Sequence, residues 1–383
     1  MAGEDGAADG RAPQYKTNDA KRRSAGSAGG GPPRYAAIDL GTNNCRLLVA
    51  APRSAGRGGA LRVVDAFSRI VRLGEGLARN GALSDAAMAR AIEALKICAD
   101  KMDRRGVTRR RCIATQACRA AANGEEFLAA VERETGLRFE IISTAEEASL
   151  AVRGCADLLD QTADRAIVFD IGGGSTELSL VRPNGAKRPK LDAWLSMPVG
   201  VVKLSETCGG RDLSADTYER VVADVGQRLR DLAAASGFPL DPPSTSSHLL
   251  GTSGTVTSIA GVHLGLDRYR RDAVDGLWLT ADDARDVSGR LRDMSWDERA
   301  REPCIGAERA DLVVCGCAIL EALLRAWPAT RIRVGDRGLR EGVLAGRAEA
   351  DRRRTRRRGH RRSGRRKRAA APSGDASALL DAS

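Results

Sequence analysis

The sequence predicts an α/β protein with two similar domains that face each other across a cleft. The main observation is a strand–turn–strand hairpin that occurs twice, at residues 35–49 and 166–180. In each copy an apolar run rich in β-formers ends at an aspartate, Asp39 or Asp170, and a turn of small residues leads into a second apolar run. Segments with strand and helix patterns alternate around these hairpins, which is typical of α/β folds.

Hydrophobic spacing and turn residues place further elements along the chain. A helix begins after Ser84, because serine is a favoured N-cap residue and apolar side chains then recur at helical spacing to about Met102. Short apolar runs bounded by polar residues predict strands, and longer segments with apolar residues three and four apart predict helices. The expected strands are 61–67, 111–115 and 138–142, and the other expected helices are about 125–134, 145–159, 215–235 and 308–326.

Length and composition fit two cores between two polar tails. A chain of 383 residues is long enough for two to three domains, and 42% of its residues are hydrophobic. No run of 18 apolar residues and no apolar leader occurs, so we expect a cytoplasmic protein that does not enter a membrane. The expected parts are a disordered tail at 1–33, a first domain at 34–153, a second domain at 154–347 and a disordered Arg-rich tail at 348–383.

The positive charge is concentrated in one segment. The chain has a net charge of +12, and residues 351–370 alone hold twelve Lys or Arg residues and one Asp. Such a block repels itself and has almost nothing to bury, so we expect it to be disordered. It either binds polyanions, nucleic acid among them, or only keeps the protein in solution.

The nine cysteines predict buried thiols. Their number is odd, and the chain shows no export signal that would favour disulfides. Cys315 and Cys317 lie close together in the apolar run 312–324, but they lack the second pair of ligands that a zinc site requires. Packing in the core is the expected role of these two thiols.

The turns of the two hairpins predict a phosphate site. Consecutive backbone N–H groups in a turn can surround an anion, and glycine lets the backbone approach it closely. The aspartate beside each turn would repel phosphate unless a divalent cation lies between them, so we expect Mg²⁺ as a cofactor. The candidate phosphate-binding residues are Gly41, Thr42, Asn43, Asn44, Cys45, Arg46, Gly172, Gly173, Gly174, Ser175 and Thr176, and the candidate metal ligands are Asp39, Asp170 and Glu177.

Two adjacent glutamates, Glu146 and Glu147, stand at the start of the helix that precedes the second hairpin. Ser143 with Glu146, and Thr144 with Glu147, both have the spacing of a capping box, and only one pair can form it in a given register. A carboxylate in the first turn of a helix stays ionised and is available to orient an attacking water.

Other residues are candidate contacts to the same anion. Arg119 follows a predicted strand, and its guanidinium either neutralises charge on a phosphate or forms a surface ion pair with Glu125 or Glu126. The remaining candidates are Lys203, for a more distal phosphate, and Gly251, Ser253 and Gly254, in a turn that opens a helix.

Five sequence blocks occur in a fixed order between residues 34 and 345. They are Asp39-Leu40-Gly41-Thr42-Asn43, Glu146-Glu147-Ala148, Asp170-Ile171-Gly172-Gly173-Gly174-Ser175-Thr176-Glu177, Gly251-Thr252-Ser253-Gly254-Thr255 and Asp336-Arg337-Gly338-Leu339-Arg340-Glu341-Gly342. Their order and spacing resemble the Ppx/GppA family of exopolyphosphatases and guanosine pentaphosphate phosphohydrolases. The resemblance implies the actin-like ATPase fold shared with sugar kinases and Hsp70. It also implies Mg²⁺-dependent removal of the terminal phosphate from inorganic polyphosphate or pppGpp.

The resemblance also implies roles for single residues. Glu147 matches the family's catalytic base, which leaves Ser143 and Glu146 as the capping pair, and Arg119 matches a phosphate-contacting arginine. Longer family members carry an extra helical domain, which we expect this chain to lack. The last block looks like a strand-to-helix junction, and we expect its residues Asp336, Arg340 and Glu341 to be architectural.

We therefore expect an exopolyphosphatase, with a pppGpp 5′-phosphohydrolase as the alternative. The same turns would bind either terminal phosphate, and the near-neutral core favours neither substrate. A kinase of the same fold and a non-catalytic sensor of polyphosphate or (p)ppGpp are weaker alternatives. A P-loop enzyme and a His-based hydrolase are disfavoured, since the glycine turn lacks Gly-Lys-Ser/Thr and the three histidines share no motif. The sequence leaves open whether the protein is a homodimer.

Overall fold

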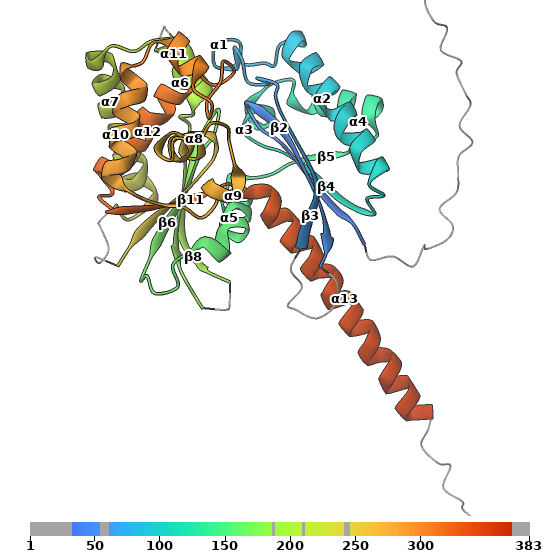
Figure 1. The fold of residues 1–383 in the computed structure, drawn as a ribbon. Helices are drawn as coiled ribbons and strands as arrows, with labels where there is room; N and C mark the ends of the chain where they lie inside the picture. The colour runs from blue at the N-terminus through green and yellow to red at the C-terminus, as the bar shows by residue number, and fades with distance from the viewer. Residues whose placement is uncertain (1–32, 54–60, 186–187, 209–210, 241–245, 370–383) are drawn as a thin grey trace, which may run out of the picture. The chain divides into compact units, whose positions relative to one another are not determined.

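The computed structural model describes residues 33–53, 61–185, 188–208, 211–240 and 246–369, with residues 355–369 described by their backbone alone. Two β-sheets with helices packed on their faces make up this part of the chain (Figure 1). The predicted tails at 1–32 and 370–383 lie outside the described residues. Within the described ranges, no helix combines the length and the apolar content that crossing a bilayer requires.

The first sheet has five strands in the order β3-β2-β1-β4-β5. They are β1 (Tyr35–Leu40), β2 (Asn44–Pro52), β3 (Leu61–Ile70), β4 (Arg109–Ala114) and β5 (Phe139–Ile141). Strands β1, β4 and β5 are parallel, and β2 and β3 are antiparallel additions. The helices of this part are α1 (Leu77–Asn80), α2 (Asp85–Arg104), α3 (Gln116–Ala120), α4 (Gly124–Thr135) and α5 (Thr144–Cys155).

The second sheet has six strands in the order β10-β11-β9-β6-β7-β8. They are β6 (Ala166–Ile171), β7 (Thr176–Arg182), β8 (Lys190–Met197), β9 (His248–Thr252), β10 (Trp278–Thr280) and β11 (Arg331–Gly335). The helical segments of this part are η1 (Ala156–Leu158), α6 (Val201–Thr207), α7 (Ala215–Ser236), α8 (Gly254–His263), α9 (Arg271–Val274), α10 (Ala281–Asp293), α11 (Trp296–Arg301) and α12 (Val313–Ala326), and α13 (Leu339–Ala369) follows.

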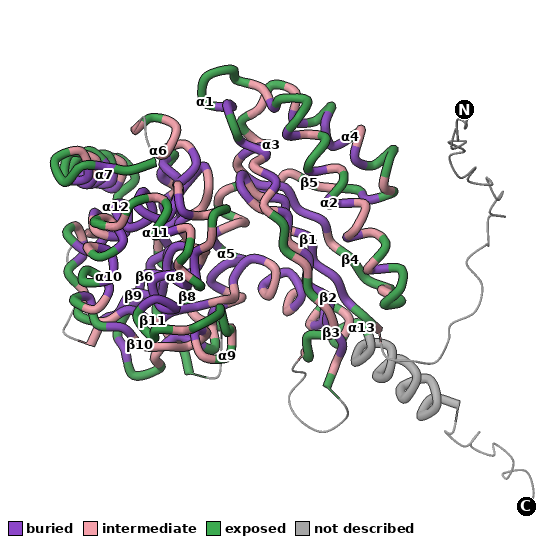
Figure 2. Tube along the Cα trace, turned by 45° about the horizontal axis from the view of Figure 1, so that its top comes forward, coloured by how far each residue is buried: buried purple, intermediate pink, exposed green. Residues whose placement is uncertain are grey.

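The two hairpins occupy equivalent places in the two sheets. β1 pairs antiparallel with β2 and parallel with β4, and β6 pairs in the same way with β7 and β9. Both strands are buried along their length (Figure 2), and in each of them the aspartate, Asp39 or Asp170, is the one residue that keeps partial exposure. The predicted α/β fold with two similar halves is confirmed.

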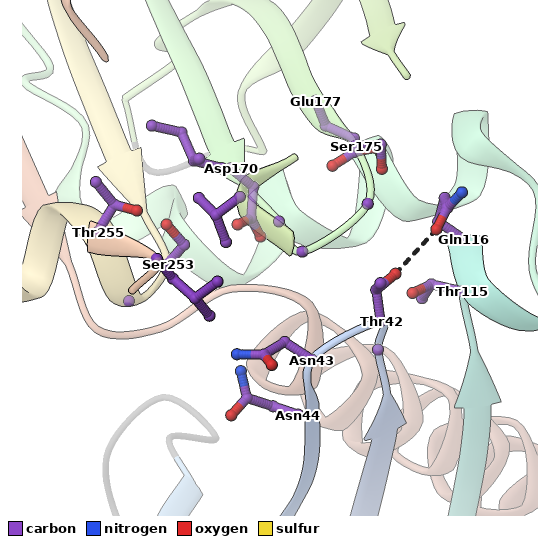
Figure 3. A pocket seen from close by; sticks show the side chains of 18 of the residues that line it. Thr42, Asn43, Asn44, Thr115, Gln116, Asp170, Ser175, Glu177, Ser253 and Thr255 are labelled. Atoms are coloured by element: carbon purple, nitrogen blue, oxygen red, sulfur yellow. Dashed lines mark hydrogen bonds between the residues drawn. The ribbon is translucent and has the colours of Figure 1, made fainter. Parts of the chain in front are cut away.

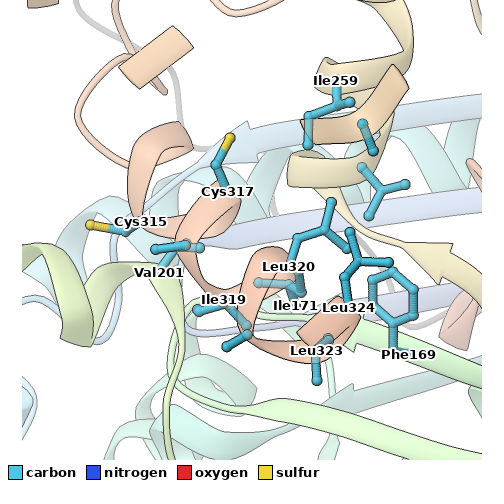
Figure 4. Packing of buried hydrophobic residues seen from close by; sticks show 14 of the residues in the cluster. Phe169, Ile171, Val201, Ile259, Cys315, Cys317, Ile319, Leu320, Leu323 and Leu324 are labelled. Atoms are coloured by element: carbon cyan, nitrogen blue, oxygen red, sulfur yellow. The ribbon is translucent and has the colours of Figure 1, made fainter. Parts of the chain in front are cut away.

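Apolar side chains on the helices fill a separate core on each sheet. In the second half, Leu320, Leu323 and Leu324 of α12 pack beside Phe169 and Ile171 of β6 (Figure 4). All nine cysteines are free; eight of them are buried and Cys208 is half-buried. The prediction of buried thiols is thus confirmed for eight of the nine.

Most predicted elements are present, with ends that differ by a few residues. Ser84 caps α2 as predicted, and its Oγ accepts a hydrogen bond from the Ala87 N–H at 3.3 Å. The helix expected at 308–326 begins only at Val313. Helices α6, α10 and α11 were not predicted. The last two begin with complete capping boxes, at Thr280 and Ser295, which the sequence analysis overlooked.

Helix α13 corrects the predicted C-terminal boundary. A disordered tail was expected from position 348, whereas the helix is continuous from Leu339 to Ala369. Alanine, arginine and glutamate have high helix propensity, and the first turns are anchored on the first sheet by buried residues that include Ala348. Tyr35 Oη also donates a hydrogen bond to the Asp351 carboxylate at 3.2 Å. The start of α13 therefore packs with the first half of the protein, although it was predicted to belong to the second.

The chain passes between the sheets twice, and the two passages lie against each other. The first leads from α5 through η1 to β6, and the second leads from β11 to α13. Helix α5 lies between the sheets, since Leu150 packs in the cluster of the first sheet and Cys155 in that of the second. A Cβ atom at Gly154 would overlap the backbone carbonyl of Gly338, so only glycine fits where the passages touch.

His248 lies in an unusual environment at the start of β9. It is fully buried, and its ring meets Trp278 edge-on with centroids 5.3 Å apart. Neither ring nitrogen has a hydrogen-bond partner among the described residues. Burial, together with the charge of Arg331, lowers the pKa of His248 from 6.5 to about 4. The folded protein therefore keeps this imidazole neutral.

This buried histidine makes stability depend on pH. Below pH 6.5 the unfolded chain binds a proton at His248 that the folded chain does not accept until about pH 4. The free energy of unfolding should therefore fall by about 3 kcal/mol across that window. The variant His248→Leu should lack this contribution, and urea denaturation of both proteins at a series of pH values measures it. An identical pH dependence in the two proteins would contradict the assignment.

Candidate functional site

A pocket opens where the ends of β1 and β6 meet (Figure 3). Its empty volume is about 920 Å³, counted with its open mouth. The turns of both hairpins, the start of α5 and the start of α8 line it. The predicted site residues that line the pocket are Asp39, Gly41, Thr42, Asn43, Asn44, Arg46, Glu147, Asp170, Gly172, Gly173, Gly174, Ser175, Glu177, Ser253 and Gly254.

The two turns have the same backbone geometry. In the first, the Gly41 N–H donates to the Asn44 carbonyl at 2.9 Å, and in the second the Gly172 N–H donates to the Ser175 carbonyl at 2.9 Å. Turns with unused N–H groups bind anions. The N–H groups that donate to no group among the described residues are those of Thr42, Asn43, Gly173 and Gly174.

The turns also touch each other across the pocket. A Cβ atom at Gly173 would lie 3.0 Å from Thr42 Cβ and 3.1 Å from the Asn43 nitrogen, closer than side chains normally pack. Glycine at 173 therefore lets the two turns approach. Thr42 Oγ1 donates to Gln116 Oε1 at 2.9 Å, which fixes the Thr42 side chain at the base of the first turn (Figure 3).

Carboxyl groups from both halves gather at the pocket. Removal from water raises the pKa of Asp39 to about 6, and the negative charge of Asp170 adds to the shift. The pKa of Asp170 is raised by burial. Burial also raises the pKa of Glu177 to about 7, although Ser175 and Ser196 donate hydrogen bonds to its Oε1 at 2.6 and 3.0 Å. Burial therefore disfavours the ionised forms of these carboxyl groups.

Glu147 lies in the first turn of α5 and is held by Arg119. The two terminal nitrogens of the Arg119 guanidinium, Nη1 and Nη2, donate to Glu147 Oε2 at 3.2 and 3.3 Å, and Nη1 also donates to the Ile142 carbonyl at 2.8 Å. Burial and the charge of Glu177 nevertheless raise the pKa of Glu147 to about 9. Oε1 is left to meet a ligand or water. Arg119 was predicted to contact phosphate or to form a surface ion pair. In the structure it pairs with Glu147 and does not line the pocket.

The neighbouring glutamate, Glu146, has a structural role at the start of α5. Ser143 Oγ accepts a hydrogen bond from the Glu146 N–H at 3.2 Å, so Ser143 is the N-cap of α5. The Glu146 carboxylate pairs with Arg111 at 2.7 Å. Half of the predicted capping box is therefore present, and the Glu146 side chain stabilises the helix start through an arginine on β4.

The donor set suits a hard cation that keeps water ligands. Among the described residues, no three Asp, Glu, His or Cys side chains come together closely enough to enclose a metal ion. Mg²⁺, however, usually takes one or two carboxylates together with water and phosphate oxygens. Asp39 and Asp170 offer such carboxylates, and a cation there would favour their ionised forms, which burial disfavours.

Four predicted phosphate-binding residues do not line the pocket: Cys45, Thr176, Lys203 and Gly251. Cys45 is the second residue of β2 and Thr176 the first of β7, and both are fully buried. Gly251 packs within β9, where its neighbours leave no space. The Lys203 ammonium donates to the Pro198 carbonyl at 3.1 Å and lines a separate groove.

Gln116 and Arg309 are among the pocket-lining residues that the sequence analysis did not predict, and their side chains can contact a ligand. Gln116 begins α3 and faces the turns through its bond to Thr42. Arg309 precedes α12, lines the pocket and lies 3.7 Å from the position of a Cβ on Gly254. A single arginine ahead of an apolar helix belongs to no recognisable motif, so only the fold brings it to the site.

A second pocket of about 1570 Å³ adjoins the first. The two share Asp39, Arg46, Asp170, Ser253, Gly254, Arg309 and Leu339. Its wall also includes two aromatic side chains, Phe67 and Tyr269, and Asp336, Arg340 and Glu341 of the last sequence block. Glu341 pairs with Arg271 at 3.0 Å, which agrees with the architectural role predicted for this block.

The backbone of Ser253, which lines both pockets, has a strained conformation. Its φ and ψ are 93° and 174°, a conformation that is almost confined to glycine. Its hydroxyl is buried and has no hydrogen-bond partner among the described residues. The strain and the unpaired hydroxyl occur together between β9 and the N-terminus of α8, where an anion is favoured.

Comparisons with known proteins show which family this chain resembles in sequence and fold. The model of the Ppx/GppA phosphatase family matches residues 53–350. Exopolyphosphatase 2 of Mycobacterium tuberculosis is 30% identical over 297 residues, which cover 76% of this chain and 90% of that protein. A crystal structure of a Ppx/GppA family member from Aquifex aeolicus has a TM-score of 0.69 at 28% identity, over 84% of this chain and 99% of that chain. An exopolyphosphatase from Cytophaga hutchinsonii has a TM-score of 0.73 at 23% identity, over 83% and 98%, and shares the fold.

The backbone strain at Ser253 predicts a change in the free energy of unfolding when this residue is replaced. Ser253→Gly should raise the free energy of unfolding by about 1 kcal/mol, because relief of about 1–3 kcal/mol of strain exceeds the entropy cost of glycine. Ser253→Ala removes only the buried, unpartnered hydroxyl and keeps the strained torsion, so it should gain less stability than Ser253→Gly. Chemical denaturation compares the three proteins. A glycine variant less stable than wild type would show that the backbone is not strained.

Proposed function

The chain belongs to the Ppx/GppA phosphatase family, and from this premise we propose that it is an Mg²⁺-dependent exopolyphosphatase. It would hydrolyse the terminal phosphoanhydride bond of inorganic polyphosphate. The observation that carries the proposal is the meeting of two turns with free N–H groups and the carboxylate of Glu147 in one pocket.

The turns would position the terminal phosphate. The unused N–H groups of Asn43 and Gly173 belong to turns that approach each other from opposite sheets, so oxygens of one phosphoryl group could accept from both. Hydrolysis of a phosphoanhydride requires mainly such positioning and neutralisation of oxygen charge. Arg309 adds a cationic side chain on the wall shared with the second pocket.

Glu147 would activate the attacking water. Water attacks the terminal phosphorus, the bond to the bridging oxygen breaks, and the shortened chain leaves with that oxygen. Glu147 Oε1 takes the proton, since Oε2 accepts from Arg119. The raised pKa of Glu147 makes its ionised form a stronger proton acceptor than an ordinary glutamate, and the charge of bound Mg²⁺ would be needed to populate that form at neutral pH. Arg119 is thus a positioning residue.

Mg²⁺ would be held by Asp39 and Asp170, with Glu177 nearby, and would offset the charge of the phosphate oxygens. Without such compensation, the carboxylates and a polyanionic substrate would repel each other in the pocket.

A pppGpp 5′-phosphohydrolase is the second candidate function. The adjoining pocket supports it, because Phe67 and Tyr269 offer aromatic surface to a base while the terminal phosphate occupies the turns. We favour polyphosphate over pppGpp as the proposed substrate for two reasons. The Mycobacterium tuberculosis relative is an exopolyphosphatase, and α13 continues into an Arg-rich segment.

Replacing the proposed base tests the proposed function. Glu147→Gln should keep the fold and substrate binding but lower kcat by about two to four orders of magnitude, the usual loss for a general base. Phosphate release is measured with Mg²⁺ on long polyphosphate and on pppGpp side by side, and again after EDTA, which should abolish turnover.

Glu146→Gln is the matched control, because Glu146 is adjacent and pairs with Arg111 outside the pocket. It should keep wild-type kcat and lose about 1 kcal/mol of stability or less. A folded Glu147→Gln protein with wild-type turnover would remove Glu147 from the mechanism, and faster turnover of pppGpp than of polyphosphate would favour the second candidate.

We also propose that the Arg-rich segment captures long polyphosphate. Helix α13 begins at the pockets, where Leu339 lines both, and its backbone leads continuously into the basic residues. A chain of phosphates is a polyanion whose attraction to such a segment grows with length and falls with salt.

Deleting residues 355–383 tests this capture. The deletion removes nine Lys or Arg residues and two Asp residues, a net charge of +7, and spares Asp351, which bonds Tyr35. KM for long polyphosphate should rise about three- to tenfold at low salt and lose salt dependence, with kcat and activity on pppGpp unchanged. A variant with the eight arginines between 356 and 368 changed to lysine keeps the charge and should behave as wild type. Equal KM values for deleted and full-length protein would disprove capture.

A further inference from the structure

A loop of the first half packs against the first turn and reaches the second half. It comprises residues 71–76, between β3 and α1, and we call it the bracket loop. The Arg72 N–H donates to the Asn43 carbonyl at 3.0 Å, and the Gly74 N–H donates to the Thr42 carbonyl at 2.9 Å. The bracket loop therefore binds the carbonyl groups of the first turn and leaves the N–H groups of Thr42 and Asn43 available to a ligand.

Arg90 of α2 holds the bracket loop on its own half. The Arg90 guanidinium donates to the Val71 carbonyl at 3.0 Å, to the Arg72 carbonyl at 3.4 Å and to the Glu75 carboxylate at 2.7 Å. Arg72 has a φ of 46°, a left-handed conformation that few residues other than glycine adopt. Such a conformation persists only where the surrounding structure fixes it, so the loop is a firmly held part of the first half.

The bracket loop also bonds to the second half. The Gly76 N–H donates to Glu206 Oε1 of α6 at 2.9 Å, and Arg72 Nη2 lies 3.1 Å from a carboxylate oxygen of Asp311, which precedes α12. The other carboxylate oxygen of Glu206 is buried without a hydrogen-bond partner among the described residues. An unpaired buried oxygen destabilises a fold, so stability alone does not explain a glutamate at this position.

Helix α6 connects this bond to the second turn. The Val201 N–H donates to the Gly172 carbonyl at 3.0 Å, and the Val202 N–H donates to the Gly173 carbonyl at 2.8 Å. Farther along the same helix, Glu206 accepts from the bracket loop. The two turns thus meet directly at Gly173 and are also linked by hydrogen bonds through α6 and the bracket loop.

This link and the two passages of the chain lie at different sides of the pocket. The starts of α5 and α13 line the pocket through Glu147 and Leu339, and the starts of α6 and α12 line it through Val201 and Val313. Figure 1 shows α6 close to α1 at the top of the view, whereas α5 and the start of α13 run between the sheets below them. A rotation of the halves about the passages would therefore separate the bracket loop from α6 and α12.

We propose that the bracket loop, Glu206 and Asp311 form a latch that holds the two turns together around the terminal phosphate. Arg72, Gly76, Glu206 and Asp311 line neither site pocket, so they are positioning residues rather than substrate contacts. The latch raises the fraction of protein in which both turns can bind one anion. This role rests on the proposed function, in which both turns hold one phosphoryl group.

Variants that break the latch test it through KM for polyphosphate in the full-length protein. In Glu206→Ala and in Asp311→Ala, KM should rise about three- to tenfold, because the apparent affinity falls with the fraction of protein that is closed. Bound substrate restores the contact between the turns, so kcat should stay within about twofold of wild type. Glu206→Gln keeps an oxygen that accepts from Gly76 and should restore the wild-type KM.

Glu75→Ala is the matched control. Glu75 lies in the bracket loop and has the same charge as Glu206, but it pairs with Arg90 of its own half. Its loss should leave both KM and kcat unchanged.

Hydrogen–deuterium exchange without substrate measures the opening itself. Gly173 covers the Asn43 N–H in the closed protein. Peptides that contain Asn43 or Gly173 should therefore exchange at least about threefold faster in Glu206→Ala than in wild type. Glu206→Gln should exchange at the wild-type rate.

Other results overturn the proposal. Unchanged KM in both alanine variants, or equal exchange at the turns in wild type and Glu206→Ala, would show that these bonds do not hold the turns together. A lower kcat at unchanged KM would assign these residues to the chemical step instead. If Glu206→Ala does not fold, Asp311→Ala decides, because it removes only a partly exposed ion pair. Failure of the proposed function is distinguishable, because wild type would then show no turnover while the exchange comparison still reports the latch.

Discussion

The direct contact between the two hairpin turns is the constraint on which the site depends. Each turn offers unused N–H groups, but the groups of both turns can reach one anion only if the turns almost touch. Gly173 makes this approach sterically possible, because any side chain there would meet Thr42 and the backbone of Asn43. The parallel pairing of β1 with β4 and of β6 with β9 sets the two strand ends where this contact forms.

The same contact concentrates negative charge. Asp39 and Asp170 end the two strands, and Glu147 approaches from α5 between the sheets. Loss of water raises the pKa of all three carboxyl groups, and repulsion from neighbouring carboxylates adds to the shift at Asp39 and Glu147. Such a site is unfavourable for the empty protein and becomes favourable when cationic charge and phosphate enter together. We see in this balance the physical reason why a metal and a polyanion would be bound as a unit.

The fold and most of the site could be predicted because they are encoded locally. A strand that ends in Asp and a small-residue turn is a short-range signal, and its repetition indicated two equivalent halves. Residues whose position depends on tertiary packing were harder. Arg309 belongs to no sequence motif, although it lines the pocket. The Lys203 ammonium donates to the Pro198 carbonyl, and Arg119 pairs with Glu147, so neither of these two lines the pocket. Charge alone suggested disorder after position 348, whereas buried residues such as Ala348 anchor a helix there.

The two passages of the chain between the sheets have a mechanical consequence. Two rigid bodies joined by one link can tilt and twist in any direction, but two links placed side by side leave a single rotation about the line through both. Here the links are α5 with η1 and the start of α13, which touch where Gly154 faces Gly338. Any opening of the halves would therefore be a rotation about this one axis. Closing would return Gly173 to the same place against Thr42, so substrate could enter without loss of register between the turns.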